Sequence, residues 1–371
     1  MLALTRIGQP CDTGSQSKEV ETVGDKPPGL AIVTSASSEV GLGHASRQFV
    51  LAHRATQRGL DPFIVSDSDW VGSECERLSL VHEQVPDIRV ATDVRNVLAR
   101  VAPARIVIDV HERDVMALQS LASLAPLSLV LSQVGYRIDF FGETVVLLGH
   151  DLDTWDRVRT ERKSDGQVTQ VRSGRAYLMF RDEFFAPSQV VREADRLLIA
   201  HGGSDECGLT QRSLHALQHT SGKYRCDVLM GSANRGRADI EDAIAVSKHA
   251  CELIHDAATP SKFMRRATVA VMSGGNIRYE LCVTGTPFVA VSFNSTQYAC
   301  TQQLADLGIG VNLGVAAQVS DEEIARAVDR LMENVEKRAQ MRSAMVGAFD
   351  HRGAERILDA IFDHRSAEFY A

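Results

Sequence analysis

Short apolar runs alternate with stretches of helical periodicity along most of the chain. In the first half, apolar runs of strand length predict strands at residues 30–35, 62–66, 79–84, 105–110, 128–132 and 144–148. Amphipathic stretches between them predict helices at residues 44–57, 93–101 and 115–124. Because strand and helix alternate, we predict βαβ units that assemble into a mostly parallel sheet.

The alternation stops at residues 151–174, which carry many charges and almost no core residues, and then restarts. In the second half, strands are predicted at residues 196–200, 226–230, 251–254, 268–272, 287–293 and 309–312. Helices are predicted at residues 210–218, 240–247, 260–266, 278–283 and 296–307. The remainder of the chain is helical in pattern, from residue 321 to about residue 364.

We therefore predict an α/β protein of two doubly wound, Rossmann-like domains joined by a linker. Residues 1–27 are polar and lack an apolar period, so we expect a disordered tail. We place the domains at residues 28–185 and 186–345, and we expect residues 346–371 to form a C-terminal helix that packs back on the first domain. In such sheets ligands bind outside the carboxyl ends of the strands. Two facing domains would thus form a cleft walled by loops that follow strands.

Composition narrows the kind of protein without changing this architecture. The 371 residues, 44% apolar and 24% charged, suit a globular chain with two cores. No apolar run reaches the roughly 18 residues of a membrane span, and the N-terminus lacks a secretory signal, so we expect a cytoplasmic protein without stable membrane insertion. A net charge of -8 without a basic stripe argues against a nucleic-acid partner. Seven cysteines without a C-x-x-C pair argue against a disulfide framework and a zinc site.

The first loop with candidate chemistry is Gly41-Leu42-Gly43-His44, between a predicted strand and a predicted helix. Glycine permits a positive φ and a close backbone approach, and the following helix N-terminus favours an anion or an electron-rich oxygen. His44 and Arg47 can share a helix face, and a histidine there can take a proton near neutral pH. A structural turn with a capping histidine is the alternative. A dinucleotide fingerprint is a weaker one, because Ser46 stands where the third glycine belongs.

Two glycine pairs follow predicted strands in the second half. One is Gly202-Gly203-Ser204, and the other is Ser273-Gly274-Gly275-Asn276. Together they could cradle a pyrophosphate from both sides, although either alone is more often a tight turn. Glu280, about one turn into the next helix, is a candidate acceptor for ribose hydroxyls or a solvated helix-face residue. Asn294 and Gln297 add polar groups at the same cleft edge.

Taken in order, these segments resemble a known family. The segments are GLGHASR, IDVHE, GRAYLMFRDEFF, LLIAHGGSDECGLTQRSLHAL, SGGNIRYELCVTGTPFVAV and TQYACTQQLADLG. They look like the nucleotide-sugar hydrolases of pseudaminic acid biosynthesis (PseG). The C-terminal pattern also resembles the lipid-linked muramyl-pentapeptide N-acetylglucosaminyltransferase (MurG) and its relatives. The resemblance covers roughly residues 29–320.

The resemblance implies a GT-B fold, with the sugar or acceptor on the first domain and the nucleotide on the second. It implies no metal and no cofactor beyond the UDP of the substrate. His44 would be the general base, and Glu280 would hold the ribose hydroxyls. The phosphates would be faced by Gly202, Gly203, Ser204, Ser273, Gly274, Gly275 and Asn276. The sugar would be contacted by Gly43, Arg47, Asp109, His111, Asn294 and Gln297.

Two segments depart from the family pattern. The family's Asp-His-Tyr-Gly is Asp109-Val110-His111-Glu112 here, so His111 holds the tyrosine position. The family's Asn-Gln pair is Thr296-Gln297, unless Asn294 takes the asparagine's place. Both changes fall where the hexose would be read, which implies a changed sugar or a changed acceptor.

We therefore expect hydrolysis of a nucleotide-activated sugar, in the first place a UDP-sugar. Water deprotonated by His44 would attack the anomeric carbon with inversion, and UDP would leave. The alternative is an inverting, metal-independent glycosyltransferase, in which His44 activates a hydroxyl or amine of a small-molecule or glycan acceptor. A non-catalytic sensor of sugar nucleotides is a third hypothesis, and it would need no base.

Overall fold

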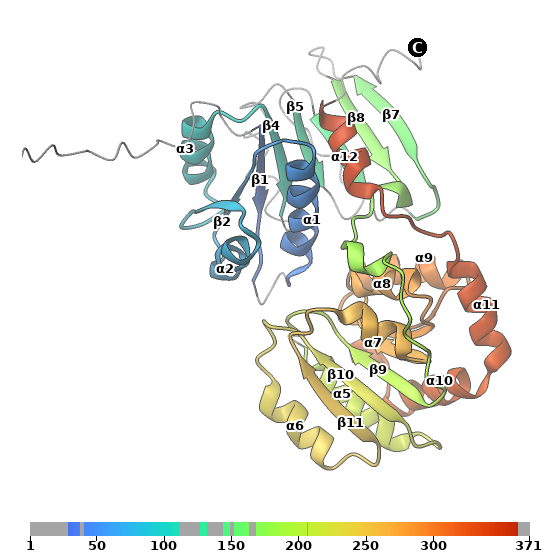
Figure 1. Ribbon diagram of the computed structural model, residues 1–371. Coiled ribbons are helices and arrows are strands. Elements are labelled where there is room, and N and C mark those ends of the chain that lie inside the picture. The colour runs from blue at the N-terminus through green and yellow to red at the C-terminus, as the bar shows by residue number, and fades with distance from the viewer. Residues whose placement is uncertain are drawn as a thin grey trace, which may run out of the picture.

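The computed structural model describes residues 29–37, 41–110, 127–131, 144–148, 152–162, 168–205 and 207–362. These residues form two α/β halves, each built on one sheet (Figure 1). The predicted tail, the predicted helix at residues 115–124 and the candidate residue His111 lie outside the described residues.

The first sheet has eight strands in the order β3-β2-β1-β4-β5-β6-β8-β7. Their bounds are β1 Leu30–Thr34, β2 Pro62–Ser66, β3 Val81–Gln84, β4 Arg105–Asp109, β5 Leu127–Leu131, β6 Thr144–Leu148, β7 Arg157–Arg162 and β8 Val168–Ser173. All neighbouring strands are parallel except β7 and β8. The six strands predicted for the first half are confirmed, with ends that differ by at most two residues.

Helices cover both faces of this sheet. Residues of β1 point alternately to the two sides, so they contribute to a hydrophobic cluster on each face. Leu30 and Ile32 pack in one cluster with α1 (Gly43–Gln57), whereas Ala31 and Val33 pack in another with α3 (Ala91–Val101). All four β1 side chains are 0% exposed. A continuous apolar run is therefore needed in this strand, as is typical of a parallel sheet buried on both faces. A further helix, α2 (Asp69–Leu78), was not among those predicted.

No strand was predicted within the charged stretch at residues 151–174, yet the structure has two strands there. Within it, β7 and β8 form an antiparallel pair, and β8 extends the sheet by pairing in parallel with β6. The pair lies at the edge of the sheet (Figure 1), where charged side chains are common because one or both faces meet water. Few core residues are needed there, so hydrophobic periodicity gives almost no signal. Val171 of β8 is a buried apolar residue, at 6% exposure.

The second sheet has six strands, all parallel, in the order β11-β10-β9-β12-β13-β14. Their bounds are β9 Arg196–Ala200, β10 Arg225–Met230, β11 Ala250–His255, β12 Val269–Met272, β13 Phe288–Ser292 and β14 Val311–Val315. The helices are α5 Leu209–Ala216, α6 Arg237–Ala245, α7 Pro260–Arg266, α8 Ile277–Val283 and α9 Ser295–Asp306. All six predicted strands are present, so the predicted α/β class of the second half is confirmed.

The helical C-terminal segment divides into α10 (Asp321–Glu333), α11 (Val335–Met345) and α12 (Gly353–Phe362). The first two lie on the second half, and α12 lies on the first half (Figure 1). Ile357, Leu358 and Ile361 of α12 are buried in the same cluster as α1. Arg58, the C-cap residue of α1, donates a 3.2 Å hydrogen bond to the Glu355 carbonyl. The chain therefore crosses between the halves a second time after the second sheet is complete.

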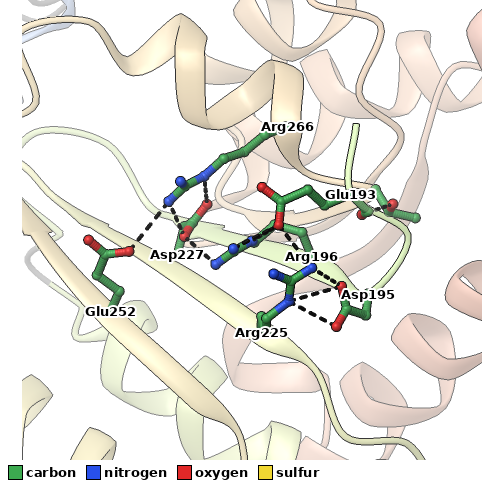
Figure 2. A network of polar contacts seen from close by, with 8 residues as sticks. Glu193, Asp195, Arg196, Arg225, Asp227, Glu252 and Arg266 are labelled. Atoms are coloured by element: carbon green, nitrogen blue, oxygen red, sulfur yellow. Dashed lines mark hydrogen bonds and ion pairs between the residues drawn. The ribbon is translucent and has the colours of Figure 1, made fainter. Parts of the chain in front are cut away.

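A network of ion pairs joins the amino ends of β9, β10 and β11 to α7 (Figure 2). At its centre is Asp227, which is 0% exposed. Its carboxylate accepts two 2.6 Å hydrogen bonds from Arg266 and one of 3.2 Å from Arg196. Arg225 is paired with Asp195 and Glu193 at the rim. The network lies at the end of the sheet opposite to the loops that follow the strands.

Replacing Asp227 with asparagine is expected to lower the free energy of unfolding by about 3–5 kcal/mol, since two arginines lose their buried counterion. Glu252→Gln is the matched control. Glu252 meets the same arginine at 3.5 Å, but its side chain is 65% exposed, so its loss should be within about 1 kcal/mol. Chemical denaturation of both variants measures the difference. Equal losses would show that burial of Asp227 contributes nothing to the network.

No helix in the described part of the chain is long and apolar enough to cross a membrane.

Candidate active site

A cleft of about 640 Å³ lies between the two halves. This volume is within the usual range for small-molecule sites. Its walls are the loops that follow β1, β9, β12 and β13, as the parallel topology predicts for ligand sites. The residues singled out in the sequence that line it are Gly43, His44, Arg47, Gly202, Gly203, Ser204, Ser273, Gly274, Gly275, Asn276, Glu280, Asn294 and Gln297.

His44 and Asp109 form a hydrogen-bonded pair on the first half. His44 is the second residue of α1 and Asp109 is the last residue of β4, and His44 Nδ1 lies 2.8 Å from Asp109 Oδ1. An ionised carboxylate can only accept hydrogen bonds, so this contact requires a hydrogen on Nδ1, although Arg47 Nη2 also lies 3.0 Å from that nitrogen. General-base chemistry then falls to the other ring nitrogen, Nε2. His44 is 3% exposed and lines the cleft.

Two further residues of α1 hold the Asp109 carboxylate. Arg47 Nε donates to Oδ2 at 2.5 Å, Arg47 Nη2 donates to Oδ1, and Gln48 Nε2 donates to Oδ2 at 2.7 Å. Burial alone would raise the pKa of Asp109. The charges of Arg47 and His44 and their hydrogen bonds outweigh it and hold the pKa well below its usual range. Asp109 is therefore ionised at neutral pH.

The expectation that Asp109 contacts the sugar is corrected by its position. Asp109 is 0% exposed and lies behind His44, away from the cleft surface. It can act on a ligand only through His44 and Arg47. The reason is geometric: Asp109 pairs with Thr34 in the sheet register, and α1 covers it.

Loops of the two halves touch across one end of the cleft. The Leu42 side chain lies so close to Gly203 that a Cβ there would be 2.6 Å from Leu42 Cδ1. Asn276 Nδ2 donates a 3.4 Å hydrogen bond to the Gly43 carbonyl. The loop that carries His44 is thus placed directly against both glycine loops of the second half.

The paired glycines serve different purposes. Gly203 and Gly274 are required by packing, because a Cβ would clash with Leu42 in the first case and with Gln297 at 2.8 Å in the second. Gly202 is required by its φ of +88°. Gly275 has an ordinary φ, and a Cβ there would meet nothing within 4 Å. Within the part of the chain described here, neither packing nor backbone conformation therefore explains why position 275, among the four paired positions, is a glycine.

The helix that follows the first glycine pair is already capped. Asp205 accepts hydrogen bonds of 2.8 Å from the backbone nitrogens of Leu209 and Thr210 at the start of α5. Its carboxylate occupies the position that an anion would take. Nearby, burial lowers the pKa of His201 to about 4, although Asp205 acts in the opposite direction, so the imidazole is neutral at pH 7. Of the two glycine pairs, the one before α8 is the better candidate for phosphate.

Glu280 presents a carboxyl group in the cleft wall. Burial raises the pKa of Glu280 to about 7; the charge of Arg181 opposes the shift and that of Glu183 adds to it. Near neutral pH this carboxyl is therefore divided between its protonated and ionised forms. A group that can accept hydrogen bonds from hydroxyls is thus present beside the second glycine pair.

Asn294 and Gln297 lie together at the start of α9. Asn294 Oδ1 accepts a 2.8 Å hydrogen bond from the Gln297 backbone nitrogen, which makes Asn294 the N-cap of the helix. Its Nδ2 donor and the second lone pair of Oδ1 could still contact a sugar. Gln297 Oε1 is a buried acceptor without a hydrogen-bond partner among the described residues.

The segment that connects the halves also lines the cleft, which the sequence did not indicate. Met179, Phe180 and Arg181 belong to it, and Arg181 forms a 2.9 Å ion pair with Glu183. These residues lie within GRAYLMFRDEFF, a segment that carried part of the family resemblance. That resemblance was the available signal. Phe293 and Cys300 are further lining residues that were not predicted.

Solved structures of glycosyltransferases resemble this chain over most of its length. MurG of Acinetobacter baumannii aligns with a TM-score of 0.59 and 13% identity, over 91% of this chain and 100% of that one. HepE of Anabaena, solved in complex with UDP-glucose, aligns with a TM-score of 0.58 and 12% identity, over 90% and 100%. At such identities the likeness shows the fold alone. The chain has the GT-B fold, as predicted.

Two curated relatives are similar in sequence. The spore coat polysaccharide biosynthesis protein SpsG of Bacillus subtilis is 24% identical over 200 residues, which is 53% of this chain and 59% of SpsG. An uncharacterized protein of Methanocaldococcus jannaschii is 21% identical over 284 residues, which is 73% of this chain and 57% of that protein. The chain thus spans less than two thirds of the length of either relative. No protein-family profile matches the chain.

Proposed function

We propose that the protein is an enzyme that cleaves a nucleoside diphosphate sugar at its anomeric carbon and transfers the sugar to an acceptor hydroxyl or amine. The observation that carries the proposal is the arrangement across the cleft. A His44–Asp109 pair lies on one side, and the Gly275 loop and Glu280 lie on the other. The GT-B fold and the names of its structural neighbours, which include MurG and other glycosyltransferases, support transfer over hydrolysis.

In the proposed reaction, His44 Nε2 takes the proton of the acceptor while the acceptor atom attacks the anomeric carbon. The carboxylate of Asp109 stabilises the imidazolium that forms. The bond between the anomeric carbon and the phosphate oxygen breaks, and its electron pair leaves with the nucleoside diphosphate. Because attack and departure occur on opposite faces, the anomeric configuration inverts. Backbone N–H groups around Gly275 would stabilise the charge on the leaving phosphate.

The nucleotide that we propose is UDP. Glu280 would accept hydrogen bonds from the two ribose hydroxyls, and the segment Ser273–Asn276 would face the phosphates. We expect no metal to be needed, so activity should be unchanged in an excess of chelator. Gly43, Arg47, Asn294 and Gln297 would face the sugar.

Hydrolysis is the second candidate, and it is favoured by one observation on His44. Its side chain is 3% exposed and adjoins loops that touch across the cleft. A water molecule reaches such a base more easily than a large acceptor does. The resemblance to the PseG hydrolases points the same way. In this reaction His44 would deprotonate water, and the free sugar would leave with UDP.

Release of UDP from a panel of UDP-sugars, with and without candidate acceptors, separates these reactions. Release that requires an acceptor supports transfer, and release at the same rate in its absence supports hydrolysis. The anomeric configuration of the first product, followed by NMR, tests inversion. If UDP binds but no donor turns over under either condition, both proposals are wrong and a binding protein remains.

Gly275→Ala is expected to weaken UDP binding by about tenfold or more, equivalent to about 1.4 kcal/mol, without a loss of stability. The added methyl group would enter open space that we assign to the phosphates. Gly203→Ala is the contrasting variant, because its methyl group would meet Leu42 and should destabilise the fold by about 1–3 kcal/mol. Calorimetric titration and thermal denaturation of both variants measure these effects. Wild-type UDP affinity in Gly275→Ala would exclude this loop as the phosphate site.

The affinity for UDP is expected to rise severalfold between about pH 6 and about pH 8, as Glu280 loses its proton. The ionised carboxylate accepts stronger hydrogen bonds from ribose hydroxyls than the neutral acid does. Glu280→Gln removes this titration but leaves that of the phosphates, so the comparison of the two proteins isolates Glu280. Parallel pH profiles for both proteins would contradict the ribose assignment.

The raised pKa of Glu280 also makes its contribution to the stability of the fold decrease as pH rises. The folded protein holds a proton on Glu280 that the unfolded chain releases between its ordinary pKa of 4.5 and about 7. The contribution of this group to the free energy of unfolding is thus largest below pH 4.5 and falls as pH rises through this window. The difference in Tm between Glu280→Gln and wild type should therefore become more favourable to the variant as pH rises.

A further inference from the structure

Two cysteines lie side by side in the second sheet, remote from the cleft loops. Cys226 is the second residue of β10 and Cys251 is the second residue of β11, and the register of the two parallel strands pairs them directly. Paired residues on neighbouring parallel strands project to the same face. Cys226 is 0% exposed, whereas Cys251 is half-buried on the edge strand.

A hydrogen bond between the two thiols shifts their pKa values in opposite directions. A hydrogen bond from Cys226 lowers the pKa of Cys251 to about 7, against the effect of burial, and Ser247 assists. The Sγ of Cys251 lies 3.6 Å from Ser247 Oγ. The same hydrogen bond, together with burial, raises the pKa of Cys226 far above its usual range. The more accessible sulfur is thus the one that becomes a thiolate, which is the nucleophilic form.

The strands are held at a separation that a disulfide can bridge. Neighbouring strands lie about 4.8 Å apart, and disulfides join Cα atoms about 4.4–6.8 Å apart. On the opposite face, Asp227 and Glu252 follow the two cysteines and are both bound to Arg266 (Figure 2). The backbone pairing of β10 and β11 places the two cysteines opposite one another.

We propose that Cys226 and Cys251 are a reversible thiol modification site, which hydrogen peroxide converts to a disulfide that ties edge strand β11 to β10. The proposal is independent of the function proposed for the cleft. It distinguishes this pair from Cys207, which is exposed, and from the buried cysteines Cys75 and Cys282.

The oxidation balances in two steps. The Cys251 thiolate attacks one oxygen of hydrogen peroxide, the O–O bond breaks, and a sulfenic acid forms on Cys251 while hydroxide leaves. The sulfur of Cys226 then attacks the Cys251 sulfur, and the S–S bond forms as the second hydroxide leaves. The two hydroxides take up the two protons lost by the thiols, one directly and one through solvent. Two thiols thereby lose two electrons, and the peroxide becomes two water molecules.

Mass spectrometry of the full-length protein tests the pair directly. Trypsin cuts after Arg225, Arg235, Lys248 and Lys262, so residues 226–235 and 249–262 each carry one of the two cysteines. After brief peroxide treatment and alkylation, we expect these peptides to be recovered linked, two hydrogens lighter than their sum, and to separate on reduction. Cys75 and Cys282 should remain reduced and serve as internal controls.

Cys251→Ser is the matched variant, because it removes the half-buried partner and keeps the fully buried one. In this variant Cys226 should stay reduced under the same treatment. Oxidation of Cys226 without Cys251 would overturn the order of steps that we propose. Recovery of both wild-type peptides alkylated and unlinked, while Cys207 is oxidised, would overturn the site itself, and this result requires no variant.

Discussion

Replacing His44 with glutamine is expected to lower kcat by about 10²–10⁴-fold, the usual contribution of a general base, and to leave UDP affinity unchanged. Glutamine is similar in reach but cannot take a proton from the acceptor. His44 lines the cleft on the half that we assign to the sugar, whereas the proposed nucleotide site is on the other half. Steady-state kinetics on the best donor, with calorimetric titration of UDP, measure the two quantities separately.

His53→Gln is the control for this experiment. His53 lies on the same helix, is exposed and contacts Gln57, so the substitution should change neither kcat nor UDP affinity. If His44→Gln retains wild-type turnover, His44 is not the base. If it loses both turnover and UDP binding, the variant has disturbed the contact between the halves, and His44→Asn would have to separate the two effects.

Asp109→Asn is expected to lower kcat by about 10²–10⁴-fold without a change in UDP affinity, although Asp109 does not reach the cleft. In the proposed reaction Asp109 would be a positioning residue, which orients the His44 ring through its 2.8 Å contact with Nδ1. An aspartate behind a catalytic histidine has an effect of this size in serine proteases. Asparagine keeps the shape but removes the charge, and it can turn its amide donor toward Nδ1. A fall in kcat with unchanged UDP binding distinguishes this role from a general loss of structure.

Gln48→Met is the matched control, since it removes one hydrogen bond to Asp109 and leaves His44 and Arg47 in place. Its kcat should fall by clearly less than that of Asp109→Asn, because one hydrogen bond to a charged group contributes about 1.5–3 kcal/mol and the Asp109 charge remains. An equal loss in both variants would mean that packing around Asp109, rather than its charge, orients His44.

Asp109 also links stability to pH. Because its folded pKa lies below the usual range, its contribution to the free energy of unfolding is complete above the unfolded pKa near 4. It is lost as pH falls through the folded pKa. Wild type should therefore lose its stability advantage over Asp109→Asn in acid, whereas the advantage should be constant at neutral and alkaline pH.

Most of the fold follows from local patterns in the sequence. Central strands of both sheets, such as β1 and β9, are runs that must be apolar because both faces are covered, so their positions can be recognised without knowledge of their neighbours. The pair β7 and β8 was missed for the complementary reason. At the edge of a sheet the same backbone pairing needs few apolar side chains, and Val158 in β7 is 49% exposed.

Local patterns in the sequence predict only part of the candidate site. His44 and the two glycine pairs stood out because each follows a strand and precedes a helix. Whether a glycine serves a ligand or a neighbouring side chain depends on what lies beside it. Gly203 and Gly275 look alike in the sequence, yet Leu42 covers the first and open space adjoins the second.

By itself, the sequence determined the alternation of strands and helices, the α/β class and the position of His44 at the start of a helix that follows a strand. These depend on the periodicity of burial within short segments. Only the tertiary structure decided that Asp109 lies behind His44 rather than in the cleft, that Asp205 occupies the start of α5, and that Cys226 faces Cys251. Each of these is a contact between residues on different elements. The order and register of the strands bring such residues together, and no short segment of sequence encodes either.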